Sequence, residues 1–134
     1  MNLIIESPRE VKDSTFIIAN IYGKRINVML DSGSHSSVIT KMFLDEMNVS
    51  IDKATTTKII NINGEKKSPL GKMNRVPIQI NEDQWDMEMI VTESKNYNVI
   101  LGSDWLSLVK GIMNYQEGTF YYEGSGDKGL TLMT

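Results

Sequence analysis

The 134-residue sequence contains no cysteine and a single histidine, His35. The lack of cysteine excludes disulfides, thiolate metal sites, iron–sulfur clusters and a cysteine nucleophile, and one histidine excludes a multi-histidine metal site. We therefore expect no metal and no other cofactor. Basic residues are also few, since 14 Lys and Arg against 17 Asp and Glu give a net charge of −3. This balance argues against a nucleic-acid partner and against a polybasic membrane-surface protein.

Long apolar runs are missing as well. No stretch approaches the ~20 apolar residues of a membrane-spanning helix. The run over residues 3–5 is cut short by Glu6, Ser7 and Pro8, so it does not form the apolar region of a secretory signal. The sequence thus predicts one cytosolic domain over residues 1–134, with no membrane partner.

Short β-rich runs separated by turn residues dominate the chain. Residues 15–21 and 25–30 flank a Tyr-Gly-Lys turn, and apolar residues alternate with polar ones over 76–80 and 85–91. A further hairpin is predicted around a glycine turn at residues 116–118. We expect an all-β fold of seven or eight strands, a closed barrel or a sandwich.

Two short helices and a tail complete the predicted order. Thr40 caps the first helix, which carries Phe43 on its apolar face, and Ser103 or Asp104 caps the second. The core is expected over residues 15–123. The glycine-rich tail, residues 124–134, is expected to be loose.

One short segment has the features of a reactive site. An apolar strand ends at Leu30 and delivers Asp31 into the turn Asp31-Ser32-Gly33, where the glycine permits close approach of the backbone. A carboxylate beside an apolar strand is costly unless it is hydrogen-bonded or neutralised. The same triplet also fits an exposed Asx-type turn, and residues 31–33 alone leave both interpretations open.

A second motif follows about seventy residues later. Asp-Ser-Gly-Ser-His-Ser-Ser-Val-Ile over residues 31–39, taken with Val-Ile-Leu-Gly-Ser-Asp-Trp-Leu over residues 99–106, resembles the retropepsin family of aspartic proteases. Within that family the two strings are most similar to the proteases of gypsy-type LTR retrotransposons. The hydrophobic-hydrophobic-Gly signature of the family is matched by Ile100, Leu101 and Gly102.

The resemblance implies a retropepsin-like barrel and a role for each residue of the triplet. Asp31 would be the catalytic acid/base, Ser32 would hydrogen-bond across a dimer axis, and Gly33 would direct its N–H toward the carboxylate. This chemistry needs two carboxylates that share one proton across a bound water. Because the chain has one Asp-Ser-Gly, the second carboxylate must come from a second copy in a twofold homodimer. Such a pair should favour cleavage at mildly acidic pH.

The resemblance also implies substrate-binding residues. Met29, His35, Val38 and Ile100 are the expected walls of the substrate channel, although ordinary core packing accounts equally well for the apolar three. Gly102 would allow the second motif to pack behind the active loop. The partner molecules are then a second copy of the chain and a peptide or polyprotein substrate.

The segment between the motifs, residues 56–80, matches the flap of the family, a hairpin that closes over bound peptide. Its Asn-Gly tip is polar and charged, and Asn63, Gly64 and Glu65 are the expected flap contacts. The substrate would lie extended beneath it, recognised through main-chain hydrogen bonds and side-chain pockets. The termini, residues 1–10 and 130–134, are further candidates for an intersubunit sheet.

One departure from retroviral enzymes bears on function. The acidic residue that retroviral enzymes commonly place two positions after the active-site glycine, and its arginine partner, are replaced by His35 and Ser103. This favours a retrotransposon-like or domesticated subtype. The first hypothesis is an active endopeptidase that processes a Gag-Pol-like polyprotein in the cytosol, including virus-like particles. The second is a domesticated module that dimerises or binds peptides without cutting, and the third is a β-barrel binding domain unrelated to proteolysis.

Overall fold

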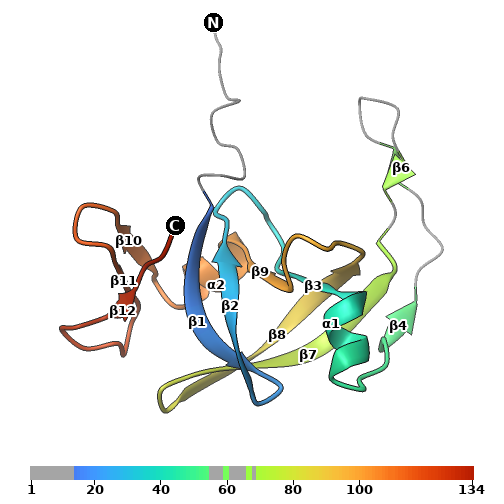
Figure 1. Ribbon diagram of the computed structural model, residues 1–134, viewed down its shortest axis with the longest axis horizontal. Coiled ribbons are helices and arrows are strands. Elements are labelled where there is room, and N and C mark those ends of the chain that lie inside the picture. The colour runs from blue at the N-terminus through green and yellow to red at the C-terminus, as the bar shows by residue number, and fades with distance from the viewer. Residues whose placement is uncertain (1–13, 55–58, 61–65, 68) are drawn as a thin grey trace, which may run out of the picture.

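The computed structural model describes residues 14–54, 59–60, 66–67 and 69–134. Twelve strands and two helices are formed within these residues (Figure 1). Their order is β1 (Thr15–Ile21), β2 (Lys24–Leu30), β3 (Val38–Thr40), α1 (Lys41–Glu46), β4 (Lys53–Ala54), β5 (Ile59–Ile60), β6 (Lys66–Lys67), β7 (Gly71–Ile80), β8 (Asp83–Thr92), β9 (Val99–Leu101), α2 (Ser103–Leu108), β10 (Ile112–Asn114), β11 (Thr119–Tyr121) and β12 (Leu130–Thr131).

Six strands close into a barrel in the order β1-β2-β9-β3-β8-β7, because β7 pairs back onto β1. The predicted all-β fold with two short helices is therefore confirmed, as a closed barrel rather than a sandwich, and the described residues form twelve strands where seven or eight were expected. Most pairs are antiparallel, but β2 lies parallel to β9 and β3 lies parallel to β8. Since parallel strands end at the same edge, the residues that follow β2 and β9 are brought side by side.

The first predicted hairpin is confirmed, and it shows how the core is built. β1 and β2 pair along their whole length, and alternate residues such as Ile17, Ile21 and Val28 are fully buried. Tyr22 and Gly23 form the two-residue turn with φ of 53° and 81°. Positive φ at both positions is the type I′ geometry, whose twist matches that of the flanking strands. The predicted hairpin of β7 and β8 is present as well.

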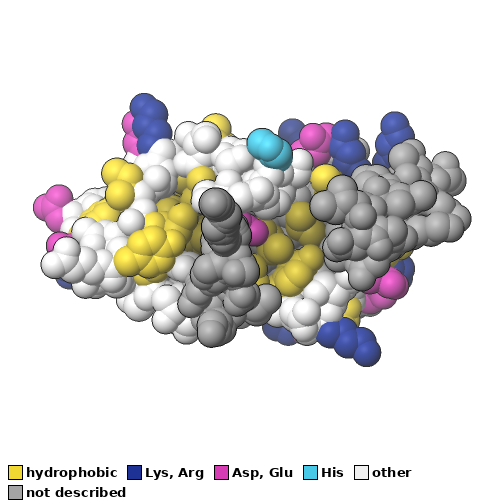
Figure 2. Space-filling model, turned by 90° about the horizontal axis from the view of Figure 1, so that it is seen from above, with side chains coloured by type: hydrophobic (Ala, Val, Ile, Leu, Met, Phe, Trp, Pro, Cys, Tyr) yellow, Lys and Arg dark blue, Asp and Glu magenta, His cyan; other side chains and the backbone are white. Residues whose placement is uncertain are grey.

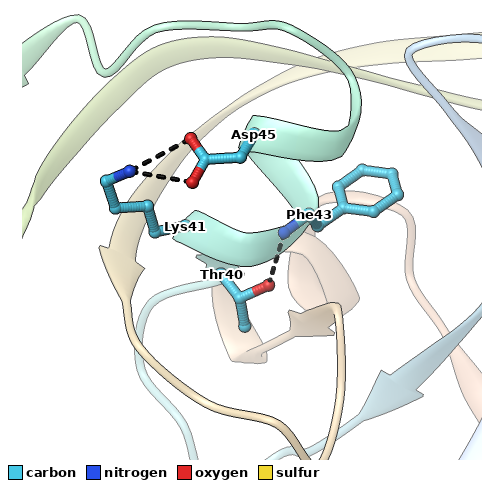
Figure 3. A network of polar contacts seen from close by, with 4 residues as sticks. All are labelled: Thr40, Lys41, Phe43 and Asp45. Atoms are coloured by element: carbon cyan, nitrogen blue, oxygen red, sulfur yellow. Dashed lines mark hydrogen bonds and ion pairs between the residues drawn. The ribbon is translucent and has the colours of Figure 1, made fainter.

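Both predicted helices are present, and none of the described helices is long and apolar enough to cross a membrane. Thr40 caps α1, and its Oγ1 accepts the Phe43 N–H at 3.2 Å, beside an exposed Lys41–Asp45 ion pair (Figure 3). The predicted cap of α2 is wrong, because the N-cap is Gly102 without a side-chain hydrogen bond. Asp104 lies in the first turn instead, where a negative charge is favourable.

The expectation of a loose tail is wrong for residues 130–133. β10 and β11 form the predicted hairpin, and β12 adds to the other side of β11. Leu132 is buried, and Met133 exchanges two backbone hydrogen bonds of 2.8 and 2.9 Å with Phe16 of β1. These apolar residues pack beside the barrel, which the glycine content of the preceding segment does not reveal. The resulting three-stranded sheet lies next to β1 (Figure 1).

Candidate active site

The loop after β2 places three predicted residues at the carboxyl end of a barrel strand. Asp31, Ser32 and Gly33 are all exposed in the single chain. The Gly33 N–H donates to Asp31 Oδ1 at 2.9 Å, in the direction that the sequence resemblance implies. A Cβ at Gly33 would lie 3.2 Å from the same oxygen, so a side chain there would crowd the carboxylate. The turn therefore fixes one carboxylate oxygen and leaves the group accessible.

Backbone contacts join this loop to the second motif. The Asp31 N–H donates to the Leu101 carbonyl at 3.1 Å, and the Ser103 N–H donates to the Ser34 carbonyl at 2.7 Å. A Cβ at Gly102 would come within 2.3 Å of the Ser34 carbonyl oxygen, so only glycine fits without a shift of the backbone. The two motifs thus form one unit, as the expected packing of Gly102 behind the loop requires.

A polar cluster that the sequence analysis missed ties the far end of the loop to α2. Ser37 is fully buried; its Oγ donates to Asp104 Oδ1 at 2.7 Å and accepts the Gly102 N–H at 3.1 Å. The other carboxylate oxygen, Asp104 Oδ2, accepts the Ser37 N–H at 2.9 Å. We name this pair of side chains the Ser37–Asp104 clamp. The sequence analysis interpreted Asp104 as a helix cap. No sequence signal therefore indicated that its hydrogen-bond partner lies 67 residues away.

A row of half-buried aliphatic side chains runs across four neighbouring strands from the active loop. Met29 lies opposite Ile100, Ile100 opposite Val38, and Val38 opposite Ile90. We name these four residues the aliphatic strip. Three of them were predicted as channel walls. Ile90 was missed because its neighbours at positions 86 and 88 are charged, and it was therefore grouped with the polar side of β8.

A hollow of about 490 Å³ lies at the far end of the aliphatic strip. Ser36, Ile90 and Asp104 line it together with Lys72 and Glu88, whose side chains form an ion pair of 2.5 Å. Lys72 lies opposite Ile90 on the adjacent strand, so the apolar strip ends at a charged pair. The lining of the hollow thus combines aliphatic and charged side chains.

The remaining predicted residues have a less defined setting. His35 is exposed, and its ring makes no hydrogen bond with the described residues. β5 and β6 pair within the predicted flap, but Asn63, Gly64 and Glu65 lie outside the described residues. In the described parts of the chain, no group of three His, Cys, Asp or Glu side chains is arranged to hold a metal ion.

Comparisons with known proteins agree with this geometry. Residues 4–124 match the family described as retroviral aspartyl protease. The retroviral protease-like domain of Ddi1 from Leishmania major aligns with a TM-score of 0.68 at 12% identity, over 90% of this chain and 94% of that one. No curated protein matches the chain.

Two solved proteases show the same fold. EIAV protease in complex with the inhibitor HBY-793 aligns with a TM-score of 0.56 at 22% identity, covering 78% of this chain and 92% of that one. A retropepsin-like aspartic protease from Rickettsia conorii gives a TM-score of 0.60 at 18% identity, with coverages of 79% and 80%.

Proposed function

Because the chain belongs to the retroviral aspartyl protease family, we propose that it is an aspartic endopeptidase that works as a homodimer. The observation that carries this proposal is the setting of Asp31. Its carboxylate is exposed, held by the Gly33 N–H, and placed where the aliphatic strip begins. Each chain offers one such carboxylate, whereas the chemistry requires two that share a proton. A second copy of the chain supplies the other.

In the proposed reaction one Asp31 carboxylate takes a proton from the bound water, whose oxygen attacks the scissile carbonyl carbon. The protonated partner carboxyl gives its proton to the carbonyl oxygen, and a tetrahedral diol forms. When the C–N bond breaks, the diol collapses to the new carboxyl group and the amine leaves with a proton from the dyad. Ser32, whose hydroxyl is exposed, is proposed to hydrogen-bond to the opposite loop.

The proposed substrate is an extended peptide that crosses the aliphatic strip. Met29, Val38 and Ile100 are proposed to contact side chains near the scissile bond, and Ile90 extends this surface to the hollow beyond. His35 is proposed as a polar wall at the rim. We also propose, from the sequence resemblance, that residues 56–80 form the flap that closes over the bound peptide.

We further propose that the parent protein is a Gag-Pol-like polyprotein of a gypsy-type LTR retrotransposon, processed in the cytosol or within virus-like particles. Support comes from the two sequence motifs at residues 31–39 and 99–106. Cleavage of a polyprotein and cleavage of a peptide place the same demand on the site, because both present an extended segment.

The test compares the wild-type chain with Asp31→Asn on a peptide library between pH 4 and pH 7. Asp45→Asn is the matched control, since Asp45 is an exposed carboxylate on α1 (Figure 3). We expect the wild type and Asp45→Asn to cleave best at mildly acidic pH. Asp31→Asn should lose cleavage and keep the dimer. Cleavage by Asp31→Asn at the wild-type rate would refute the proposal.

A second function has one observation in its favour. The aligned domain of Ddi1 is described as protease-like, so this fold also occurs as one domain of a protein that is not itself named a protease. The alternative is a retropepsin-like module that dimerises or binds peptides without cutting. A stable wild-type dimer that binds library peptides and cleaves none of them would select this alternative.

A further inference from the structure

The row of residues that forms the aliphatic strip continues across two more strands of the same sheet. Lys72 of β7 lies opposite Ile90, and Lys53 of β4 lies opposite Lys72. Both lysines are exposed. Because directly opposite residues of paired strands project to the same face, the lysines lie on the face that carries the strip. One face of the sheet therefore presents an apolar row that ends in two adjacent positive charges.

The two views of the molecule agree with this arrangement. In Figure 1 the loop after β2 lies at the top of the barrel, and β4 lies at the right. Figure 2 views the molecule from above and shows hydrophobic side chains right of centre, with Lys and Arg side chains beyond them on the right. A peptide that crosses the aliphatic strip toward β4 therefore meets basic side chains.

The charges of the two lysines are compensated to different degrees. Lys72 Nζ forms an ion pair of 2.5 Å with Glu88, which lies on the same face of the sheet. Lys53 makes no ion pair within the part of the chain that the structure describes. Like charges directly opposite each other on paired strands are unfavourable, so an anion placed between Lys53 and Lys72 would relieve a repulsion as well as gain an attraction.

The carboxylates nearest to this row already have partners in the chain. Asp104, which lines the hollow with Lys72, accepts three hydrogen bonds of 2.7 to 2.9 Å within the clamp and at the start of α2. Asp52 precedes Lys53, and its Oδ2 accepts the Asn74 N–H at 2.8 Å. A carboxylate brought by another molecule is thus the complement that Lys53 lacks.

The spacing of the row matches that of an extended peptide. Neighbouring strands lie about 4.8 Å apart, so Lys72 is about 5 Å and Lys53 about 10 Å beyond Ile90 across the sheet. In an extended peptide, residues i and i+2 project to the same face and lie about 7 Å apart. A side chain two residues beyond the one that rests on Ile90 consequently falls between the two lysines.

We propose that Lys53 and Lys72 select substrates that carry an acidic side chain, Asp or Glu, two residues beyond the side chain that rests on Ile90. The inference rests on the proposed function and deepens it, because it assigns a charge requirement to the peptide that crosses the aliphatic strip. The twofold symmetry of the proposed dimer presents the same row on both sides of the scissile bond, so the requirement applies on either side.

The test starts from an uncharged library peptide that the wild type cleaves, with the cleaved bond located by mass spectrometry. Ile90→Ala identifies the peptide position that rests on Ile90, as the one where the preference for a large aliphatic side chain falls. Glu, Gln or Lys is then placed at each other position in turn. Two residues beyond the identified position, Glu should lower KM about threefold relative to Gln, and Lys should raise it. The value of kcat should not change, because this contact is remote from the reacting atoms. High salt should abolish the difference.

Three variants of the chain sharpen the test. Lys53→Glu should reverse the order, so that the Lys peptide has the lowest KM. Glu88→Gln removes the carboxylate that competes for Lys72 and should strengthen the preference for Glu. Lys110→Glu is the matched control, because it makes the same change in net charge at an exposed lysine just before β10, on the other side of the molecule (Figure 1).

The outcomes separate this inference from the proposed function. A preference for Glu that Lys53→Glu reverses and Lys110→Glu leaves intact supports the inference. Equal KM values for the Glu, Gln and Lys peptides, or a preference that Lys53→Glu does not alter, overturn it and leave the protease proposal standing. A wild type that cleaves no peptide overturns the proposed function. Fluorescence anisotropy of labelled library peptides then decides the inference, since tighter binding of acidic peptides that Lys53→Glu weakens supports it, and any other result overturns it. Thermal unfolding of each variant checks that it is folded.

Discussion

Removing one oxygen atom from the Ser37–Asp104 clamp tests how the active loop is held. Ser37→Ala deletes the hydroxyl that donates to Asp104 and accepts from Gly102. Because Ser37 is fully buried, the Gly102 N–H loses its acceptor with no water to replace it, whereas Asp104 Oδ1 keeps the Trp105 N–H at 2.7 Å. An unsatisfied buried polar group costs about 1–3 kcal/mol, and the bond lost here involves a charged acceptor. We expect Ser37→Ala to lower the free energy of unfolding by about 2–3 kcal/mol.

The assay is urea unfolding, with peptide cleavage measured in parallel. Ser36→Ala is the matched control, because Ser36 lies on the same loop and its hydroxyl makes no hydrogen bond with the described residues. Loss of a hydroxyl that makes no such hydrogen bond is expected to change the free energy of unfolding by no more than about 0.5 kcal/mol. Cleavage should fall in Ser37→Ala even where the protein is fully folded, since the loop that carries Asp31 loses a fixed point. Equal stability of the two variants would refute the role of the clamp.

Three further predictions follow from the same structure. Gly102→Ala should destabilise the fold by roughly 3 kcal/mol or more, as for other forced overpacking, because its Cβ meets a backbone oxygen at 2.3 Å; differential scanning calorimetry measures this, and an unchanged melting temperature would contradict it. Ile90→Ala should raise KM for peptides with large aliphatic side chains more than for those with small ones, and equal changes would exclude Ile90 from the substrate surface. Burial and the hydrogen bond to Asp83 raise the pKa of Tyr122 above its ordinary value, so the folded state holds this proton more tightly. Its contribution to stability is present below about pH 10 and is lost as the pH rises through the folded-state pKa. Tyr122→Phe should flatten that loss in urea unfolding between pH 9 and pH 11, and an unchanged slope would contradict the assignment.

Local sequence patterns were sufficient to predict the turns, caps and strands that depend on interactions between nearby residues. The Tyr22-Gly23 turn, the Thr40 cap and the alternation along β7 and β8 all depend on residues a few positions apart. The active triplet was found because its chemistry is unusual after an apolar strand, and its neighbour in space was found through the resemblance. These features therefore needed no coordinates.

Contacts between distant segments could not be predicted in the same way. The clamp joins Ser37 to Asp104, and each residue has an ordinary local explanation, as a loop serine and as a helix cap. Ile90 joins the aliphatic strip only through the parallel pairing of β3 with β8, which no short-range signal specifies. Met133 forms backbone hydrogen bonds with Phe16, near the other end of the chain, although the segment before Met133 is rich in glycine.

The wide separation of the two motifs also has a kinetic consequence. Contacts between segments 67 residues apart form only after a large loop has closed, which places them among the slower events of folding. The surroundings of the Asp31 loop are therefore completed only after these two segments have met. If two finished chains must then meet, hydrolytic capacity grows with the square of their abundance while they are scarce. A rise in the local concentration of chains would then raise activity more than in proportion.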